Sequence, residues 1–121
     1  MKKILSIEDD TLIGAALAEN LKQAGFEVER AKDGEVGLAM ALKDHPDLIL
    51  LDILLPKMDG LTVLNKLRQD SWGKNVPVIV LTNLSEPEDV AATIDTVSEY
   101  LVKVDWTIDD VVKRIKEKLK L

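Results

Sequence analysis

The chain has 121 residues, which fits one compact domain, and its composition of 46% hydrophobic and 31% charged residues is ordinary for a globular protein. The lack of cysteine and the single histidine exclude a disulfide scaffold, a thiolate or multi-histidine metal site and cysteine nucleophilic catalysis. A formal charge of −6 and an aromatic content of 3% disfavour direct nucleic-acid binding as the main task.

No segment of the sequence is typical of a membrane span or an export signal. The apolar run 4–7 is too short for the core of a signal peptide, and no stretch approaches the roughly 18 apolar residues of a membrane helix. We expect a soluble cytoplasmic protein without membrane contact, folded as a single domain over residues 1–121 with no second domain.

Short apolar runs alternate with segments of helical periodicity. Residues 4–7 predict a buried strand, and residues 28–31 predict a more polar strand near the edge of a sheet. Between these strands we expect a helix that stops at Gly25. Its apolar residues recur at helical spacing, at Ile13, Leu17, Leu21 and Ala24.

The next helix is predicted to begin at Asp33, whose side chain can cap the first turn, and to end near Lys43. We expect it to turn three residues inward, namely Val36, Ala39 and Met40. Residues 48–51 are uniformly apolar, which indicates a strand covered on both faces. A loop with Pro56 and Gly60 precedes a third helix, whose apolar residues are Leu61, Leu64 and Leu67.

The same alternation continues to the end of the chain. Residues 76–81 predict a central strand with Pro77 at its start, where no ladder hydrogen bond is lost. A capping box over 85–88 predicts a fourth helix, with Val90, Ala91 and Ile94 on one side. Residues 100–104 predict the last strand. Thr107 can cap a fifth helix, and the apolar stripe of that helix is Ile108, Val111, Val112, Ile115 and Leu119.

Alternating strands and helices predict an α/β fold in which a doubly wound parallel sheet of five strands is flanked by five helices. Right-handed crossovers and a reversal of strand order place the functional crevice at the carboxyl ends of the strands. Polar side chains follow four of these ends: Glu8, Asp9 and Asp10, then Asp52, then Thr82, then Lys103.

Carboxylates that converge at one sheet edge repel each other, and burying them without compensation is costly. A hard divalent cation resolves this conflict, and an oxygen-only donor set favours Mg²⁺, with Mn²⁺ as the alternative. Asp52 is the best candidate nucleophile because it is the sole carboxylate that ends the central strand. The Lys103 ammonium and the Thr82 hydroxyl are then placed to contact phosphoryl oxygens.

Each of these residues also has a purely structural interpretation. Asp10 can do no more than cap the first helix, and Asp52 can begin a turn. Thr82 can be an ordinary strand residue, and Lys103 a solvated lysine at the edge of the sheet. Their coincidence at one edge favours the functional interpretation.

Four segments, in order, resemble the receiver domain of two-component response regulators: residues 4–10, 52–60, 80–82 and 100–103. The second segment is the most specific, because Asp52 is followed by proline at +4 and by aspartate and glycine at +7 and +8. The resemblance covers essentially the whole chain. It implies a flavodoxin-like fold, similar to the chemotaxis receiver, with the strand order 2-1-3-4-5.

The resemblance also implies roles for individual residues. Asp52 would accept a phosphoryl group, and Thr82 and Lys103 would contact its oxygens. Asp9 would be a direct Mg²⁺ ligand, and Glu8 would act largely through water. Asp52 and the backbone carbonyl of Leu54 would complete the protein's share of the metal shell, and Tyr100 matches the aromatic residue that switches rotamer in this family.

As a receiver, the chain would be a phosphorylation switch and not an enzyme acting on other substrates. A histidine kinase or phosphotransfer protein would be the donor. The face formed by the fourth helix, the fifth strand and the fifth helix would change and bind a downstream protein, as a monomer or as a weak homodimer through that face. A charge of about −1.5 to −2 arrives with the phosphoryl group, and the response is a population shift.

The sequence departs from the family pattern at three places. Val104 replaces the usual proline after Lys103, and a cis bond without proline would cost about 2.5–4 kcal/mol, so the loop must hold Lys103 in another way. Asn83 follows Thr82 where small residues are common. Leu54 and Leu84 stand where polar residues often position the hydrolytic water, and we therefore expect slow self-dephosphorylation.

Two other functions remain open from the sequence. A Mg²⁺-dependent phosphohydrolase could use the same aspartyl chemistry, but such enzymes usually carry a second acid two residues after the nucleophile, where this chain has Leu54. A receiver-like interaction module that is never phosphorylated is the other alternative. The retained Asp52, Asp9, Thr82 and Lys103 argue against it.

Overall fold

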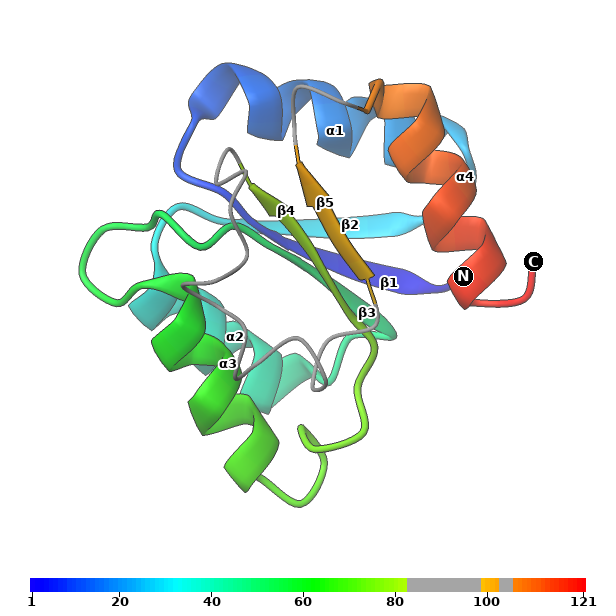
Figure 1. Ribbon diagram of the computed structural model, residues 1–121. Coiled ribbons are helices and arrows are strands. Elements are labelled where there is room, and N and C mark those ends of the chain that lie inside the picture. The colour runs from blue at the N-terminus through cyan, green and yellow to red at the C-terminus, as the bar shows by residue number, and fades with distance from the viewer. Residues whose placement is uncertain (83–98, 103–105) are drawn as a thin grey trace.

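The computed structural model describes residues 1–82, 99–102 and 106–121. Strands and helices alternate along the described residues as far as Thr82, after which the next described element is the strand Glu99–Val102 (Figure 1). The strands are β1 (Lys3–Ile7), β2 (Glu27–Ala31), β3 (Leu48–Leu51), β4 (Val78–Thr82) and β5 (Glu99–Val102). The helices are α1 (Thr11–Gln23), α2 (Gly34–Asp44), α3 (Gly60–Gln69) and α4 (Ile108–Lys118). The predicted helix behind the capping box at 85–88 lies outside the described residues, so α4 corresponds to the fifth predicted helix.

The five strands form one sheet in the order β2-β1-β3-β4-β5, and every neighbouring pair is parallel. This confirms the predicted sheet and its strand order, including the place of the polar strand β2 at an edge. Because β1 lies between β2 and β3, the chain reverses its direction of winding after β2. The carboxyl ends of β1 and β3 are neighbours at this reversal, and Ile7 pairs with Leu51 there.

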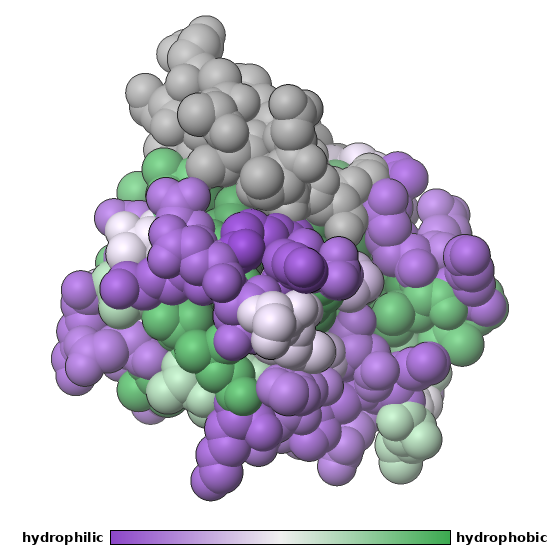
Figure 2. All heavy atoms as spheres, turned by 90° about the horizontal axis from the view of Figure 1, so that it is seen from below, coloured by the Kyte–Doolittle hydropathy of each residue, from purple (hydrophilic) through white to green (hydrophobic). Residues whose placement is uncertain are grey.

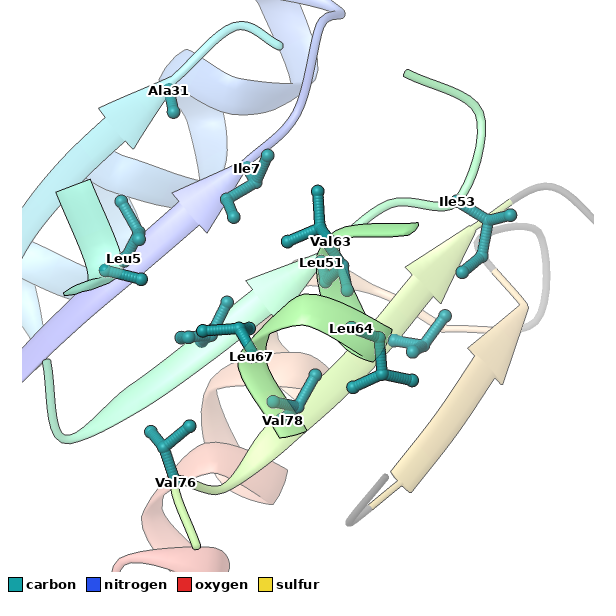
Figure 3. Close-up of a cluster of buried hydrophobic side chains, with 13 residues drawn as sticks. Leu5, Ile7, Ala31, Leu51, Ile53, Val63, Leu64, Leu67, Val76 and Val78 are labelled. Carbon is teal, nitrogen blue, oxygen red and sulfur yellow. The ribbon is translucent and has the colours of Figure 1, made fainter. Parts of the chain in front are cut away.

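Two apolar layers cover the sheet. Leu5, Ile7, Ile49 and Leu51 belong to the cluster under α2 and α3, and Figure 3 shows Leu64 and Leu67 of α3 lying over these strands. The residues that alternate with them, such as Ile4 and Leu50, belong to the cluster under α1 and α4. The strands β1 and β3 are thus buried on both faces, which explains the nearly continuous apolar runs in their sequences.

The outer surface is mainly polar. Figure 2 looks at the molecule from below the view of Figure 1 and shows hydrophilic side chains with smaller apolar areas between them. Each described helix buries one face in the core and exposes the other face to solvent. In the described parts of the chain, none of the helices is both long and apolar enough to cross a membrane.

Side-chain caps fix the start of each described helix. The carboxylate of Asp10 accepts hydrogen bonds from the backbone of Leu12 and Ile13, and the carboxylate of Asp33 accepts one from Val36. Thr107 and Asp110 form the reciprocal capping box of α4. The predicted starts at Asp33 and Thr107 are thereby confirmed, as is the capping interpretation of Asp10.

The buried face of α2 differs from the prediction. Val36 is 46% exposed and Ala39 is also exposed, while Met40 packs against the core only in part. The buried residues of this helix are the small ones, Gly34, Gly37 and Ala41. Small side chains let the helix backbone approach the sheet closely, and an apolar-residue count does not detect such a face.

Two strand boundaries also move. The strand predicted over 76–81 begins two residues later, at Val78, and Pro77 stands just before it, with its carbonyl accepting a hydrogen bond from Ile49 at 3.0 Å. The last strand begins at Glu99 and is described to Val102. Residues 103 and 104 of its predicted range lie outside the described residues.

The capping box of α4 gives a stability prediction. Its two hydrogen bonds, from the Asp110 backbone to the Thr107 hydroxyl and from the Thr107 backbone to the Asp110 carboxylate, are 3.1 and 3.2 Å long. Replacing Thr107 with alanine removes one of them, and we expect the free energy of unfolding to fall by about 1 kcal/mol. Urea denaturation at pH 7 measures this loss.

The same cap makes the loss of stability in Thr107→Ala depend on pH. Hydrogen bonds from Thr107 hold the pKa of the Asp110 carboxyl below its ordinary value of 3.8. Stability from this carboxylate is present above that value and is lost as the pH falls through the lowered pKa. The difference in the free energy of unfolding between wild type and Thr107→Ala should therefore become smaller in acid. Thr62→Ala, in the first turn of α3 whose cap is Asp59, is the control, and an equal loss in both variants would contradict the assignment.

Candidate functional site

The ends of β1 and β3 bring acidic residues together. Glu8 follows β1 and Asp52 follows β3, and the ladder continues into both residues. The Asp52 backbone donates to the Ile7 carbonyl at 3.1 Å, and the Glu8 backbone donates to the Ala31 carbonyl at 3.0 Å. Because the backbones are paired to this point, the two side chains leave the sheet at one place.

Glu8, Asp9 and Asp52 form a compact cluster. One carboxylate oxygen of each lies within 4.8 Å of the others. Only 7% of Glu8 and 5% of Asp52 is exposed, whereas Asp9 faces solvent. The structure thus brings together three of the four acids that the sequence placed at this edge, while the fourth, Asp10, caps α1.

Backbone N–H groups hold two of these carboxylates. The Asp10 backbone donates to Glu8 Oε2 at 3.2 Å, and the Leu54 backbone donates to Asp52 Oδ1 at 3.3 Å. The contact from Leu54 was not predicted, since the sequence argument gave this residue only a carbonyl role. An aspartate that accepts from the backbone two residues on is a recognised local turn, so a signal for it was present.

The loop after Asp52 is folded tightly onto the strand end. The Gly60 backbone donates to the Ile53 carbonyl at 2.9 Å. A Cβ atom at position 60 would overlap the Asp52 carbonyl oxygen and would come within 2.7 Å of the Ile53 Cα atom. Glycine is therefore required here, and the close approach fixes the backbone that carries Asp52 and Leu54.

The other predicted site residues are described to different extents. Thr82 ends β4, is fully buried and pairs in register with Val102. Tyr100 pairs in register with Val80 within the sheet, and its side chain lies outside the description. Lys103, together with Asn83, Leu84 and Val104, lies outside the described residues. Leu54 is 57% exposed at the rim of the acidic cluster.

The donor set fits a hard divalent cation. All the side-chain ligands are carboxylate oxygens, which Mg²⁺ and Mn²⁺ prefer. Opposite ligands of Mg²⁺ lie about 4.2 Å apart, close to the spread of these three oxygens. A divalent cation among these carboxylates would offset their mutual repulsion. Glu8, Asp9 and Asp52 are thus the residues that could hold the metal.

A separate hollow of about 300 Å³ lies between α1 and α4. Its lining is apolar and includes Leu12, which is 83% exposed, and Trp106. The Arg114 guanidinium stacks 5.0 Å from the centre of the Trp106 ring. Among the described residues, the side chains that line this hollow are all non-titratable.

Comparison with known proteins shows the family to which the chain belongs. The chain matches the family of the response regulator receiver domain over residues 4–116. It is 38% identical to the DNA-binding dual master transcriptional regulator RpaA of Synechocystis, over 99% of this chain and 50% of that protein. The chain spans about half the length of the curated relatives it matches.

Solved structures are similar over nearly the whole chain. A CheY-like receiver domain from Methanospirillum hungatei superposes with a TM-score of 0.90 at 31% identity, covering 99% of this chain and 94% of that one. TrrA from Thermotoga maritima, solved in complex with Mg²⁺ and BeF, superposes with a TM-score of 0.85 at 31% identity, covering 97% and 98%.

The fold is a doubly wound α/β domain with an acidic cluster at the carboxyl ends of its strands. The chain belongs to the response regulator receiver family of two-component signalling. This is not a family of conventional enzymes. Its members are domains whose state is set by phosphorylation, and they interact with histidine kinases or phosphotransfer proteins and with downstream effectors.

The acidic cluster predicts how Mg²⁺ affects stability. A cation that binds only the folded protein raises the free energy of unfolding, by about 2.7 kcal/mol at a concentration one hundred times its dissociation constant. Asp9→Asn removes one ligand and one repelling charge. We therefore expect this variant to be more stable than wild type without divalent ions, and to bind Mg²⁺ on the order of tenfold more weakly.

Thermal unfolding with and without MgCl₂, at constant ionic strength, measures both effects. Asp59→Asn is the matched control, because Asp59 is also an exposed aspartate; it caps α3 and lies outside the cluster. Equal stabilisation of wild type and Asp9→Asn by Mg²⁺ would contradict the assignment of Asp9 as a ligand.

Proposed function

We propose that this chain is a phosphoacceptor switch in which Asp52 receives a phosphoryl group from a histidine kinase or a phosphotransfer protein. The observation that carries the proposal is the nearly buried Asp52 carboxylate within 4.8 Å of the Glu8 and Asp9 oxygens at the carboxyl edge of the sheet. Such a carboxylate is fixed for attack, and it has neighbours able to hold a cation.

The proposed metal shell consists of Asp9, Asp52, the Leu54 backbone carbonyl and Glu8, the last largely through water. Bound Mg²⁺, or Mn²⁺, supplies charge neutralisation for the incoming phosphoryl oxygens. The burial of Glu8 supports its proposed role in the metal shell, because a buried carboxylate has little room to turn away from the cluster toward solvent.

The transfer is a substitution at phosphorus. An oxygen of the Asp52 carboxylate forms a bond to phosphorus while the phosphorus–nitrogen bond of the donor phosphohistidine breaks. The imidazole leaves with the electron pair of that bond and takes up a proton. The Leu54 N–H group, 3.3 Å from Asp52 Oδ1, orients the carboxylate during this step. Thr82 and Lys103 are proposed to contact the phosphoryl oxygens of the product.

The switch follows from the added charge of about −1.5 to −2. Thr82 and Lys103 would be drawn to the phosphoryl group, and Tyr100 would move toward the space that Thr82 leaves. We propose that the surface formed by the predicted fourth helix, β5 and α4 then binds a downstream protein or a second copy of the chain. The protein would catalyse only its own phosphorylation and dephosphorylation. The cytoplasmic location stays a prediction.

Phosphorylation of Asp52 can be tested directly. We expect incubation with Mg²⁺ and acetyl phosphate to add the mass of one phosphoryl group to the intact protein. Asp52→Asn should abolish the adduct, because an amide cannot form the acyl phosphate. Intact-protein mass spectrometry checks this, and chelation of Mg²⁺ should slow formation of the adduct strongly.

Asp59→Asn serves as the control in this experiment, since asparagine caps a helix as well as aspartate does and Asp59 lies outside the acidic cluster. Its adduct should equal that of wild type. An adduct that persists in Asp52→Asn would place the acceptor elsewhere. Steady turnover of small phosphoesters would favour the phosphohydrolase, and a wild type without any adduct would favour the unphosphorylated module.

A slow loss of the phosphoryl group is the second expectation. Leu54 is 57% exposed beside Asp52 and offers no polar side-chain atom to align a water molecule for attack on phosphorus. Leu54→Asn supplies such atoms and keeps the backbone groups. We expect the lifetime of the phosphorylated protein to shorten by about tenfold, less than the roughly 10²–10⁴-fold that a proton-transfer group contributes, because an amide positions water without taking its proton.

Leu12→Asn is the matched control, because Leu12 is an exposed leucine at the hollow between α1 and α4. Its phosphorylated lifetime should equal that of wild type. A wild-type lifetime no longer than that of receivers with polar residues at these positions would refute the hypothesis, as would an unchanged lifetime in Leu54→Asn.

A further inference from the structure

The first residue of α2 touches the loop that follows Asp52. A Cβ atom at Gly34 would overlap the Met58 carbonyl oxygen and lie 2.7 Å from the Met58 carbonyl carbon. Both atoms belong to the backbone, so no side-chain rotation could relieve the collision. Position 34 thus has room for a hydrogen atom only, and the loop rests directly on the start of α2. Figure 1 shows both segments at the left of the molecule.

Two polar contacts reinforce this packing. The Gly34 backbone donates a long hydrogen bond to the Pro56 carbonyl at 3.4 Å. Asp33, of which only 9% is exposed, caps α2 with Oδ1 and places Oδ2 4.0 Å from the Lys57 ammonium. Lys57 has a φ of 65°, which is uncommon for a residue with a side chain, so its backbone is held there by its surroundings.

The loop is short enough to transmit this contact to the acidic cluster. Its interior is tied by hydrogen bonds from Leu55 to the Ile53 carbonyl at 3.1 Å and from Met58 to the Pro56 carbonyl at 2.7 Å. Near the start of the loop, the Leu54 N–H group donates a hydrogen bond to Asp52 Oδ1. A shift of Met58 would therefore move the peptide groups on both sides of Leu54.

We propose that the turn Asp33–Gly34 is a positioning element of the metal site. It sets the place of the 53–59 loop and thereby the direction of the Leu54 backbone groups relative to Asp52. This inference rests on the proposed function, because it assigns the 53–59 loop to the cation. Coupling between two sites is reciprocal, so cation binding should also stabilise the first turn of α2.

The first test compares two glycine variants. Gly34→Ala should weaken Mg²⁺ binding on the order of tenfold, as loss of a supporting contact around a metal ligand does. Gly73→Ala is the matched control, because its Cβ atom would also meet backbone, the Leu67 carbonyl, at the far end of α3. It should lose stability and keep the wild-type Mg²⁺ affinity. Isothermal titration calorimetry with MgCl₂ gives the affinities, and circular dichroism confirms folding.

The second test needs no variant and holds even where Gly34→Ala fails to fold. The Val36 and Gly37 amides donate to Asp33, within the first turn of α2. Mg²⁺ should slow their hydrogen exchange several-fold. The His45 amide, which donates to the Ala41 carbonyl at the other end of α2, should be unchanged.

The outcomes separate this inference from the proposed function. If the wild-type protein binds no Mg²⁺, both the positioning role and the proposed function are overturned. If wild type binds Mg²⁺ and is phosphorylated at Asp52, but the Val36 and Gly37 amides show no added protection, only the positioning role is overturned. Equal Mg²⁺ affinity of a folded Gly34→Ala and wild type would overturn it as well. Weaker binding in Gly34→Ala with wild-type affinity in Gly73→Ala supports it.

Discussion

Repulsion between carboxylates at the ends of the neighbouring strands β1 and β3 is the main constraint on the carboxyl edge of the sheet. Glu8 and Asp52 are nearly buried, and their oxygens lie within 4.8 Å of each other and of Asp9. Such an arrangement costs free energy in the folded state unless donors or a cation compensate it. Backbone N–H groups of Asp10 and Leu54 compensate part of this charge. In the proposed function, a cation and with it a phosphoryl group add to this compensation.

The rest of the fold supplies the rigidity that keeps these charges together. β1 and β3 are buried on both faces, between the cluster under α2 and α3 and the cluster under α1 and α4. Their strand ends cannot separate without exposing apolar side chains from both layers. The acids are attached to this rigid part, whereas Thr82 and Tyr100, which we propose to respond to phosphorylation, lie in β4 and β5.

Local and tertiary features were predictable to different degrees. The caps at Asp10, Asp33 and Thr107 act within three residues of the helix start, so the sequence alone indicated them. The acidic cluster was predictable because parallel strands end at one edge, whatever the details of packing. The inward face of α2 was not, because glycine and alanine give no apolar signal, and the contact of Gly34 with Met58 depends on two segments that only the fold brings together.

The contact between α2 and the 53–59 loop bears on how a change at Asp52 can spread. A population shift requires that the two states of the switch differ in their contacts, and a contact in which backbone meets backbone cannot adapt by side-chain rotation. The end of the loop at Gly60 is equally close to Asp52. Movement of the Leu54 peptide must then either be resisted by both glycine contacts or be shared with the first turn of α2. If the proposed positioning role holds, both alternatives involve the side of the sheet under α2 in the switch, in addition to the face expected from the family.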